Sequence, residues 1–166
     1  MLNLEIDKLT NSIEHAVTGE TFETLVVQVE ASNLKSLGVR SWVFDWKKEF
    51  ANQSRQLYKL VATADKSIIH GLLSLSINED HIFMHLIENS KGNKGANKQY
   101  LGVAGNLIAY ACKLSFENGF DGIVVFESKT SLITHYQISV GAKILAGNRM
   151  FIDTKESSLL VKRYFK

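Results

Sequence analysis

Three strand-like runs follow one another between Leu57 and Glu88, and the short connections between them constrain the fold more than any other feature of the sequence. The second run, Ser67 to Ile77, places apolar side chains at alternate positions, which is typical of a half-buried strand. Parallel neighbours would need a crossover of about a dozen residues or more. We therefore predict an antiparallel meander, made of the runs Leu57–Thr63, Ser67–Ile77 and His81–Glu88.

A different order of elements follows the meander. Helical periodicity extends from Val103 to Asn118, and a short apolar run from Gly122 to Glu127 predicts another strand. A strand, a helix and a strand in this order form a crossover, which makes the two strands parallel. We therefore predict an α+β fold with a central mixed sheet flanked by helices. The remaining predicted elements are a helix over Ile6–Val17, a strand over Phe22–Val29, helices over Ser32–Leu37, Trp42–Phe50 and Ser131–Val140, a hairpin of Lys143–Leu145 with Arg149–Ile152, and a last helix that Asp153 caps.

Size and composition limit the classes of protein that the chain can belong to. Its 166 residues carry no linker or repeat, so we predict one domain over residues 1–166. The net charge is +2 and the basic residues are scattered, which gives no support for nucleic-acid binding. The sole cysteine, Cys112, makes no internal disulfide and falls in an apolar helical pattern, so we interpret it as a core residue. The sequence shows neither a signal peptide nor a membrane span, which predicts a soluble, cytoplasmic protein without a membrane partner.

The segment from Gln99 to Asn106 has the character of an anion-binding site. It lies between a polar loop and the predicted helix that begins at Val103. The first main-chain N–H groups of a helix have no partner inside the helix, and the helix dipole adds partial positive charge there. Small residues at Gly102, Ala104 and Gly105 would let a phosphate approach the main chain closely. The alternative is an ordinary glycine-bearing helix start.

Two motifs carry a resemblance to a known family. The pattern Gln99-x-x-Gly102-x-Ala104 resembles the Q/R-x-x-G-x-G/A motif with which GCN5-related N-acetyltransferases bind the diphosphate of acetyl-CoA. Downstream, the run Thr134 to Ala142 is similar to the family's helix that contains a Tyr and ends at a Gly. The resemblance covers about Leu57 to Ile152 and implies acetyl transfer from acetyl-CoA to a primary amine, with no metal cofactor.

The resemblance also implies roles for individual residues. Leu86 and Ile87 would diverge from the parallel neighbour and bind the pantetheine arm through main-chain groups, and Lys129 or Thr130 would lie beside that arm. Tyr136 would protonate the departing thiolate, because its ordinary pKa of about 10 keeps it protonated at neutral pH. Glu88 is the first candidate for the general base and Glu127 is the second. The residues expected to bind the diphosphate are Gln99, Gly102, Val103, Ala104, Gly105 and Asn106.

Several alternatives remain open at this stage. The alternative for Tyr136 is a half-buried aromatic side chain that packs its helix on the sheet. The alternative for Glu88 and Glu127 is a pair of solvated carboxylates at strand ends. We interpret the cluster of Trp42, Phe44 and Trp46 as part of the core. The alternative interpretation is that these side chains form a wall of the acceptor pocket. His81 and His85 lack a recognisable third metal ligand, so a structural or pocket role is favoured. The whole chain could be a non-catalytic acyl-CoA-binding or regulatory module, or a protein-interaction domain without a CoA site. A small-molecule or protein amine is the expected acceptor, and a homodimer is possible.

Overall fold

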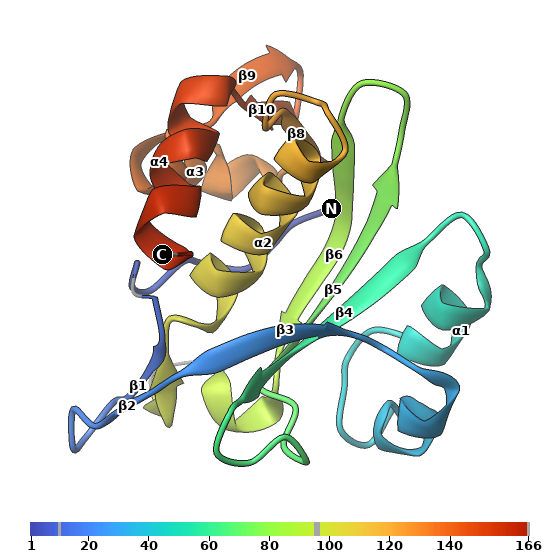
Figure 1. The fold of residues 1–166 in the computed structure, drawn as a ribbon, viewed down its shortest axis with the longest axis vertical. Coiled ribbons are helices and arrows are strands. Elements are labelled where there is room, and N and C mark those ends of the chain that lie inside the picture. Colours follow the sequence, from blue (N-terminus) through green and yellow to red (C-terminus); the bar gives the residue numbers. More distant parts are fainter. Residues whose placement is uncertain (10, 95–96, 166) are drawn as a thin grey trace.

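The computed structural model describes residues 1–9, 11–94 and 97–165, and its centre is a seven-stranded sheet in the order β3-β4-β5-β6-β8-β10-β9 (Figure 1). A second, three-stranded sheet has the order β2-β1-β7. The strands are β1 Ile13–His15, β2 Thr21–Phe22, β3 Thr24–Gln28, β4 Gln56–Ala62, β5 Gly71–Ile77, β6 Ile82–Asn89, β7 Tyr100–Leu101, β8 Val124–Glu127, β9 Lys143–Ala146 and β10 Arg149–Ile152. The α-helices are α1 Trp46–Ala51, α2 Val103–Glu117, α3 Ile133–Val140 and α4 Thr154–Tyr164, and short 3₁₀ turns are η1 Ala31–Ser36, η2 Lys91–Asn93 and η4 Thr130–Leu132.

The predicted meander and crossover are both confirmed. Strands β4, β5 and β6 pair antiparallel with consecutive neighbours, and β3 adds to β4 in the same sense. Helix α2 then connects β6 to β8, and these two strands pair in parallel. The C-terminal hairpin of β9 and β10 completes the sheet beside β8. The fold class predicted from the sequence, α+β with a mixed central sheet, is therefore correct.

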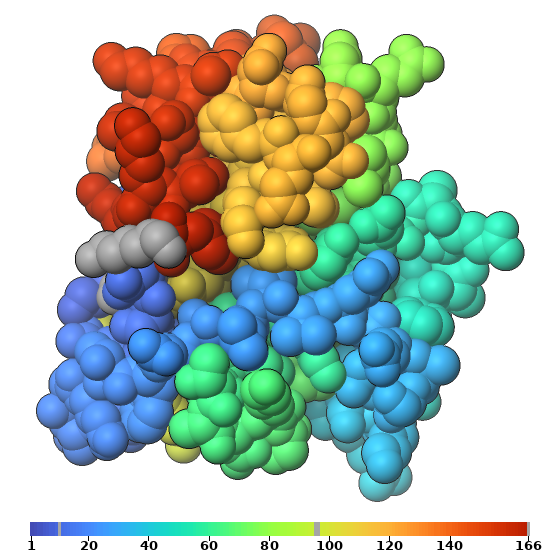
Figure 2. Space-filling view, viewed as in Figure 1, coloured from blue at the N-terminus to red at the C-terminus, as the bar shows by residue number. Residues whose placement is uncertain are grey.

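The two faces of the sheet carry separate hydrophobic clusters. The larger cluster joins the sheet to α2, α3 and α4, and it includes Leu73, Leu107 and Tyr136. Figure 2 shows α2 and α4 side by side on the outside of the larger cluster, in agreement with the contacts between these two helices. The smaller cluster lies on the other face, where Trp46 of α1 and Trp42 pack with Leu72. Trp42 and Trp46 are 3% and 0% exposed, which confirms their interpretation as core residues.

Strand β5 corrects the prediction of a half-buried strand. Leu73 and Leu75 face the larger cluster and Leu72 faces the smaller one, so β5 is covered on both sides. Ser74, expected on a solvent face, is fully buried, and its hydroxyl donates a hydrogen bond of 2.7 Å to Glu49 of α1. The alternation of apolar and polar side chains therefore predicted strand β5 correctly. It could not show that α1 covers the polar side of this strand.

The helix predicted over Ile6–Val17 is wrong. Residues 3–9 form no helix or strand, and Ile13–His15 is a strand that pairs with β2 and β7. In the extended stretch that precedes it, Leu2 and Ile6 are buried while Asn3 and Glu5 are exposed, an alternation that fits an extended chain. Its main-chain groups bond to other parts of the fold, so contacts rather than helical spacing decide its conformation.

Smaller differences concern the helices before the meander. Helix α1 begins at Trp46 rather than Trp42, because Asp45 caps it by accepting a hydrogen bond from the Lys48 N–H at 3.1 Å. The predicted helix over Ser32–Leu37 is the 3₁₀ turn η1. At the C-terminal end, the Asp153 side chain accepts the Glu156 N–H at 2.9 Å, which confirms it as the cap of α4.

Candidate functional site

The parallel pair β6 and β8 diverges soon after it begins. Within β6, Ile82–Asn89, pairing with β8 is limited to Ile82, Phe83 and Met84. A bulge then interrupts the β5–β6 ladder, where Ser74 pairs with Leu86 and Leu75 pairs with Met84, so that His85 has no opposite residue. Bulges bend a strand and increase its twist, which accounts for the end of the parallel pairing. Leu86 and Ile87 consequently lie beyond the paired part of β6, in the arrangement expected from the sequence, and the space between the two strands is called here the β6–β8 groove.

The start of α2 lies at one end of this groove and already binds a carboxylate. Gly102 caps the helix with φ of 97°, a left-handed conformation that glycine adopts without strain. Its main-chain N–H donates a hydrogen bond of 3.0 Å to Oδ1 of Asp7, while Lys98 donates to Oδ2 at 3.0 Å. Of the predicted diphosphate-binding residues, Gln99 is exposed, whereas Gly102, Val103, Ala104, Gly105 and Asn106 are all buried.

Gly105 and Asn106 join the start of α2 to other parts of the chain. A Cβ at Gly105 would lie 2.3 Å from the Tyr164 hydroxyl and 3.3 Å from the Lys8 carbonyl oxygen. Asn106 donates its side-chain N–H groups to the carbonyls of Gly102 and Ser12, at 2.7 and 3.2 Å. Asn106 thereby ties the first turn of α2 to the segment that precedes β1, a positioning role that its place in the motif did not indicate.

Residues 2–7, called here the groove segment, lie along the β6–β8 groove. Leu2 forms a parallel bridge with Ser128, since its N–H donates to the Glu127 carbonyl at 2.6 Å and its carbonyl accepts the Lys129 N–H at 2.8 Å. The Ile6 N–H donates to Nε2 of His135 at 2.8 Å. Figure 1 shows the blue N-terminal segment passing behind α2 towards β1. His135, interpreted from the sequence as a surface residue, is half-buried and contacts this segment.

Tyr136 is the buried end of this set of contacts. It is 1% exposed, its ring packs edge-on against Phe126 at 5.3 Å, and its hydroxyl donates a hydrogen bond of 2.5 Å to the Leu4 carbonyl oxygen. Burial raises the pKa of Tyr136 to about 12, with a further contribution from the Glu5 carboxylate that the bond to Leu4 opposes. The phenol is therefore a protonated donor at neutral pH.

Glu88 lies on the opposite face of the sheet, towards α1. Its carboxylate accepts hydrogen bonds from the N–H groups of Val43 and Phe44, at 2.8 and 3.0 Å, from the Trp46 indole at 2.9 Å and from Lys94 at 2.6 Å. Burial alone would raise the pKa of Glu88, but the hydrogen bonds from Lys94 and the three N–H donors outweigh it and hold the pKa below its ordinary value. Such a fully bonded carboxylate is a weak proton acceptor.

Glu127 and Lys129 contact the groove segment through their main chains, as described for Leu2. The Glu127 side chain is 45% exposed and pairs with Arg149 at 3.2 Å. Of the two predicted bases, Glu127 is thus the more accessible. Lys129 caps the turn η4 that leads into α3, and its side chain is exposed.

His81, just before β6, and His85 in β6 have local partners. His81 contacts Asp80 and Asn78 at 2.7 and 2.9 Å, and Nε2 of His85 lies 2.8 Å from the Ser76 hydroxyl. Burial, helped by the nearby Arg55 guanidinium, lowers the pKa of His85 to about 4. Within the described ranges, no three or more His, Cys, Asp or Glu side chains group as metal ligands, and no helix has the length and apolar character needed to cross a membrane.

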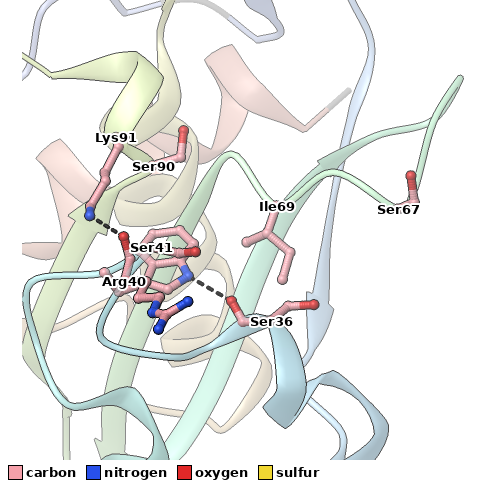
Figure 3. Close-up of a pocket in the computed structure, with 8 residues that line it drawn as sticks. Ser36, Arg40, Ser41, Ser67, Ile69, Ser90 and Lys91 are labelled. Atoms are coloured by element: carbon pink, nitrogen blue, oxygen red, sulfur yellow. Dashed lines mark hydrogen bonds between the residues drawn. The ribbon is translucent and has the colours of Figure 1, made fainter.

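A separate hollow of about 280 Å³ lies on the α1 face of the sheet. Figure 3 shows its labelled side chains, which come from the end of η1 and the loop before α1, from the loop before β5, and from the residues that directly follow β6. Lys91 donates a hydrogen bond to the Arg40 carbonyl oxygen, and the Trp42 indole donates to the Ser36 carbonyl at 2.9 Å. None of the residues predicted as catalytic or CoA-binding lines this hollow, so it is distinct from the β6–β8 groove.

Comparison with known proteins agrees with this geometry. No family model and no curated protein matches the sequence. Among solved structures, the spermidine/spermine N-acetyltransferase SpeG from Vibrio cholerae is 15% identical with a TM-score of 0.58, and the match covers 82% of this chain and 96% of SpeG. The toxin AtaT, solved with acetyl-CoA and the C-terminus of its antitoxin AtaR, is 14% identical with a TM-score of 0.57, covering 82% and 97% of the two chains.

The chain has the fold of the GCN5-related N-acetyltransferases. A further structure of this fold, the IAA acetyltransferase from Bacillus cereus, is 14% identical with a TM-score of 0.54, and the match covers 75% of this chain and 79% of that one. Some structures with the fold are toxins, and another structure with the fold is a complex of KacTA with DNA. At 10–16% identity these likenesses establish the shared fold, so activity and partners of this chain are taken up as proposals.

Within the acetyltransferase fold, sequence reasoning missed the groove segment and its partners. The alternation of Leu2, Leu4 and Ile6 with Asn3 and Glu5 was a signal for an extended chain, but the helical spacing from Ile6 onwards obscured it. Pairing of Asp7 with Gly102 and Lys98 joins residues more than ninety positions apart and left no local signal. The remaining missed residues are Lys94, which bonds Glu88, and His135.

Proposed function

We propose that this chain is an acyl-CoA-dependent N-acyltransferase that moves an acetyl group from acetyl-CoA to a primary amine. The observation that supports this most strongly is the β6–β8 groove, which ends beside a helix start whose Gly102 N–H already binds an anionic group, the Asp7 carboxylate. A helix start that binds one anion is chemically suited to a diphosphate. Beyond Met84 the edges of β6 and β8 no longer pair with each other, and an extended ligand could add to them in place of the N-terminal residues that now bond there.

The residues that would hold acetyl-CoA surround this groove. Main-chain groups of Leu86 and Ile87 and the turn at Lys129 would bind the pantetheine arm. The thioester supplies an activated acyl group that an amine can attack directly. The first turn of α2 and the residues before it would bind the diphosphate, through Gln99, Gly102, Val103, Ala104, Gly105 and Asn106.

Proton transfers are assigned to side chains on the two faces of the sheet. Tyr136 belongs to the larger cluster and would give its phenolic proton to the departing thiolate. Glu127 would take the proton of the attacking amine, directly or through water. We place Glu127 ahead of Glu88 because the Glu88 carboxylate already accepts four hydrogen bonds. Positioning of amine and thioester side by side would supply much of the rate.

A non-catalytic acyl-CoA-binding module is the second candidate. Two observations favour it: the groove segment covers Tyr136, and Glu88 is held by structural hydrogen bonds. The amine acceptor, whether a small molecule or a protein, and a homodimeric state remain part of the proposal rather than findings.

Binding and turnover together distinguish these possibilities. We expect acetyl-CoA to raise the melting temperature, since a ligand at one hundred times its Kd adds about 2.7 kcal/mol to the stability of the native state. We expect an amine panel to release free thiol from acetyl-CoA. A melting-temperature rise without turnover favours the binding module, and no rise with CoA or acetyl-CoA contradicts a CoA site altogether.

A further inference from the structure

We propose that the groove segment, residues 2–7, is an internal competitor of acyl-CoA that must leave the β6–β8 groove before the cofactor can bind. This inference rests on the proposed function, because it names what regulates the same site. Three independent contacts of the segment occupy groups that the proposed CoA site requires.

The first contact is main-chain pairing beside the end of β8. Leu2 bonds to both Glu127 and Lys129, at 2.6 and 2.8 Å, as an added parallel strand would. Leu2 is 1% exposed and belongs to the larger hydrophobic cluster. An extended pantetheine arm lying between the diverging strands would occupy the same volume, so the two cannot be present together.

The second contact removes the proposed acid. The Tyr136 hydroxyl donates its proton to the Leu4 carbonyl at 2.5 Å, and Tyr136 is almost completely buried. One hydroxyl has one proton to donate. While Leu4 holds it, the phenol cannot reach a thiolate in the groove.

The third contact places a negative charge at the start of α2. Oδ1 of Asp7 accepts the Gly102 N–H, and Lys98 neutralises Oδ2. The Asp7 and Lys98 side chains are 16% and 17% exposed, so this ion pair is partly shielded from water. A carboxylate here uses the N–H that a diphosphate would bind and repels a second anion.

The groove segment is tethered to the rest of the fold at its C-terminal end. Its exposed side, formed by Asn3 and Glu5, borders a hollow of about 260 Å³ together with Asn93, Lys94 and Lys98. Beyond the segment, β1 pairs with both β2 and β7 and anchors the chain. Release would therefore expose one short tethered stretch, whose high effective concentration favours its return.

Calorimetric titration of acetyl-CoA into full-length variants tests the competition. A substitution that weakens binding of the groove segment raises the fraction of molecules whose groove is free for CoA. The apparent affinity for CoA rises in proportion to that fraction. We expect Asp7→Ala and Leu2→Ala each to tighten the apparent Kd by about tenfold, given the strength of a charge-assisted bond or a buried side chain. Glu5→Ala removes an exposed carboxylate from the same segment and serves as the matched control, with an expected change under about twofold.

Hydrogen exchange on the unmodified protein provides a second readout that needs no variant to fold. We expect CoA to accelerate exchange at the Leu2 and Ile6 amides, which lose Glu127 and His135 as acceptors, and to leave the β1 amides unchanged. Unchanged or slower exchange at Leu2 and Ile6 in the CoA complex overturns the proposal.

The outcomes separate the two proposals. If wild type, Asp7→Ala and Leu2→Ala bind CoA with equal affinity, the competition is refuted while the CoA site stands. If neither the wild type nor any variant binds CoA, the proposed function fails and the competition fails with it. Tightening in Glu5→Ala equal to that in Asp7→Ala attributes the effect to net charge and also refutes displacement.

Discussion

Two carboxylates on opposite sides of the central sheet are held in different ways. On the α1 face, Glu88 is 4% exposed and accepts four hydrogen bonds from Val43, Phe44, Trp46 and Lys94. In the groove, Asp7 reaches the start of α2 from an extended segment and has Gly102 and Lys98 as partners. Glu88 joins elements that define the fold, whereas Asp7 belongs to a stretch that forms no helix or strand of its own.

The difference indicates that the Glu88 carboxylate stabilises the fold, whereas water or a ligand anion can replace the Asp7 carboxylate. Removing Glu88 leaves buried N–H donors and a lysine without their acceptor, and no solvent can reach them easily. Removing Asp7 uncovers a helix start that water or an anion can satisfy. We therefore assign Glu88 to stability and Asp7 to control of the groove, and the following experiments test that division.

The largest expected effect is on stability at Glu88. Glu88→Ala should lower the free energy of unfolding by about 3–5 kcal/mol, because it breaks a buried charged network on one side only. Asp7→Ala should cost only about 1–2 kcal/mol. Urea denaturation measures both. Equal losses at the two positions would remove the distinction drawn here.

The contribution of Glu88 to the free energy of unfolding should decrease at acid pH. The folded state lowers the pKa of Glu88, so the unfolded state binds its proton more readily. The stability that Glu88 contributes is therefore fully present at neutral pH and decreases as pH falls below the ordinary value of about 4.5. The stability gap between wild type and Glu88→Ala, followed by denaturation from pH 7 to pH 3, should narrow on the acid side. A gap that widens would contradict the lowered pKa.

Tyr136→Phe tests the groove side of the comparison. If Tyr136 is the proton donor to the thiolate, kcat should fall by about 10²-fold, the usual lower range for loss of a general acid. The same change removes the bond to Leu4 and should loosen the groove segment. Thiol release and CoA affinity should be measured together, with Tyr110→Phe, a half-buried tyrosine of α2 outside the groove, as the matched control. Unchanged kcat with tighter CoA binding would leave Tyr136 only the role of holding the segment.

The smallest expected effect concerns the backbone at the start of α2. Gly102 has φ of 97°, a conformation that costs a side-chain-bearing residue about 1–2 kcal/mol. Gly102→Ala should lower stability by that amount in thermal denaturation. Gly38→Ala is the control, because its Cβ would meet no atom within 4 Å and its φ is not positive. A neutral Gly102→Ala would show that this turn can rearrange freely.

The part of the fold that follows from local pattern was predictable, and the part that depends on distant contacts was not. The meander and the β6–α2–β8 crossover rest on strand alternation, helical periodicity and connection length, all of which are local. The start of α2 was located by its small residues. Residues 2–9, in contrast, take their conformation from β8, α3 and α2, so the helical spacing that begins at Ile6 misled the prediction.

The candidate site shows the same division. Tyr136 and Gly102 both bond to the groove segment, and Leu86 and Ile87 lie beyond the paired part of β6, while the binding and catalytic roles of these residues stay predictions. The network around Glu88 could not be foreseen, because three of its four donors, Val43, Phe44 and Trp46, lie 42 to 45 residues earlier in the chain. Covering of Ser74 by α1 was hidden for the same reason.

A crystal structure of the full chain with CoA tests the central claim most directly. The account predicts the diphosphate on the first turn of α2, the pantetheine arm between β6 and β8, and residues 2–7 displaced from Glu127, Tyr136 and Gly102. A complex in which CoA lies elsewhere while Asp7 still accepts the Gly102 N–H would contradict it.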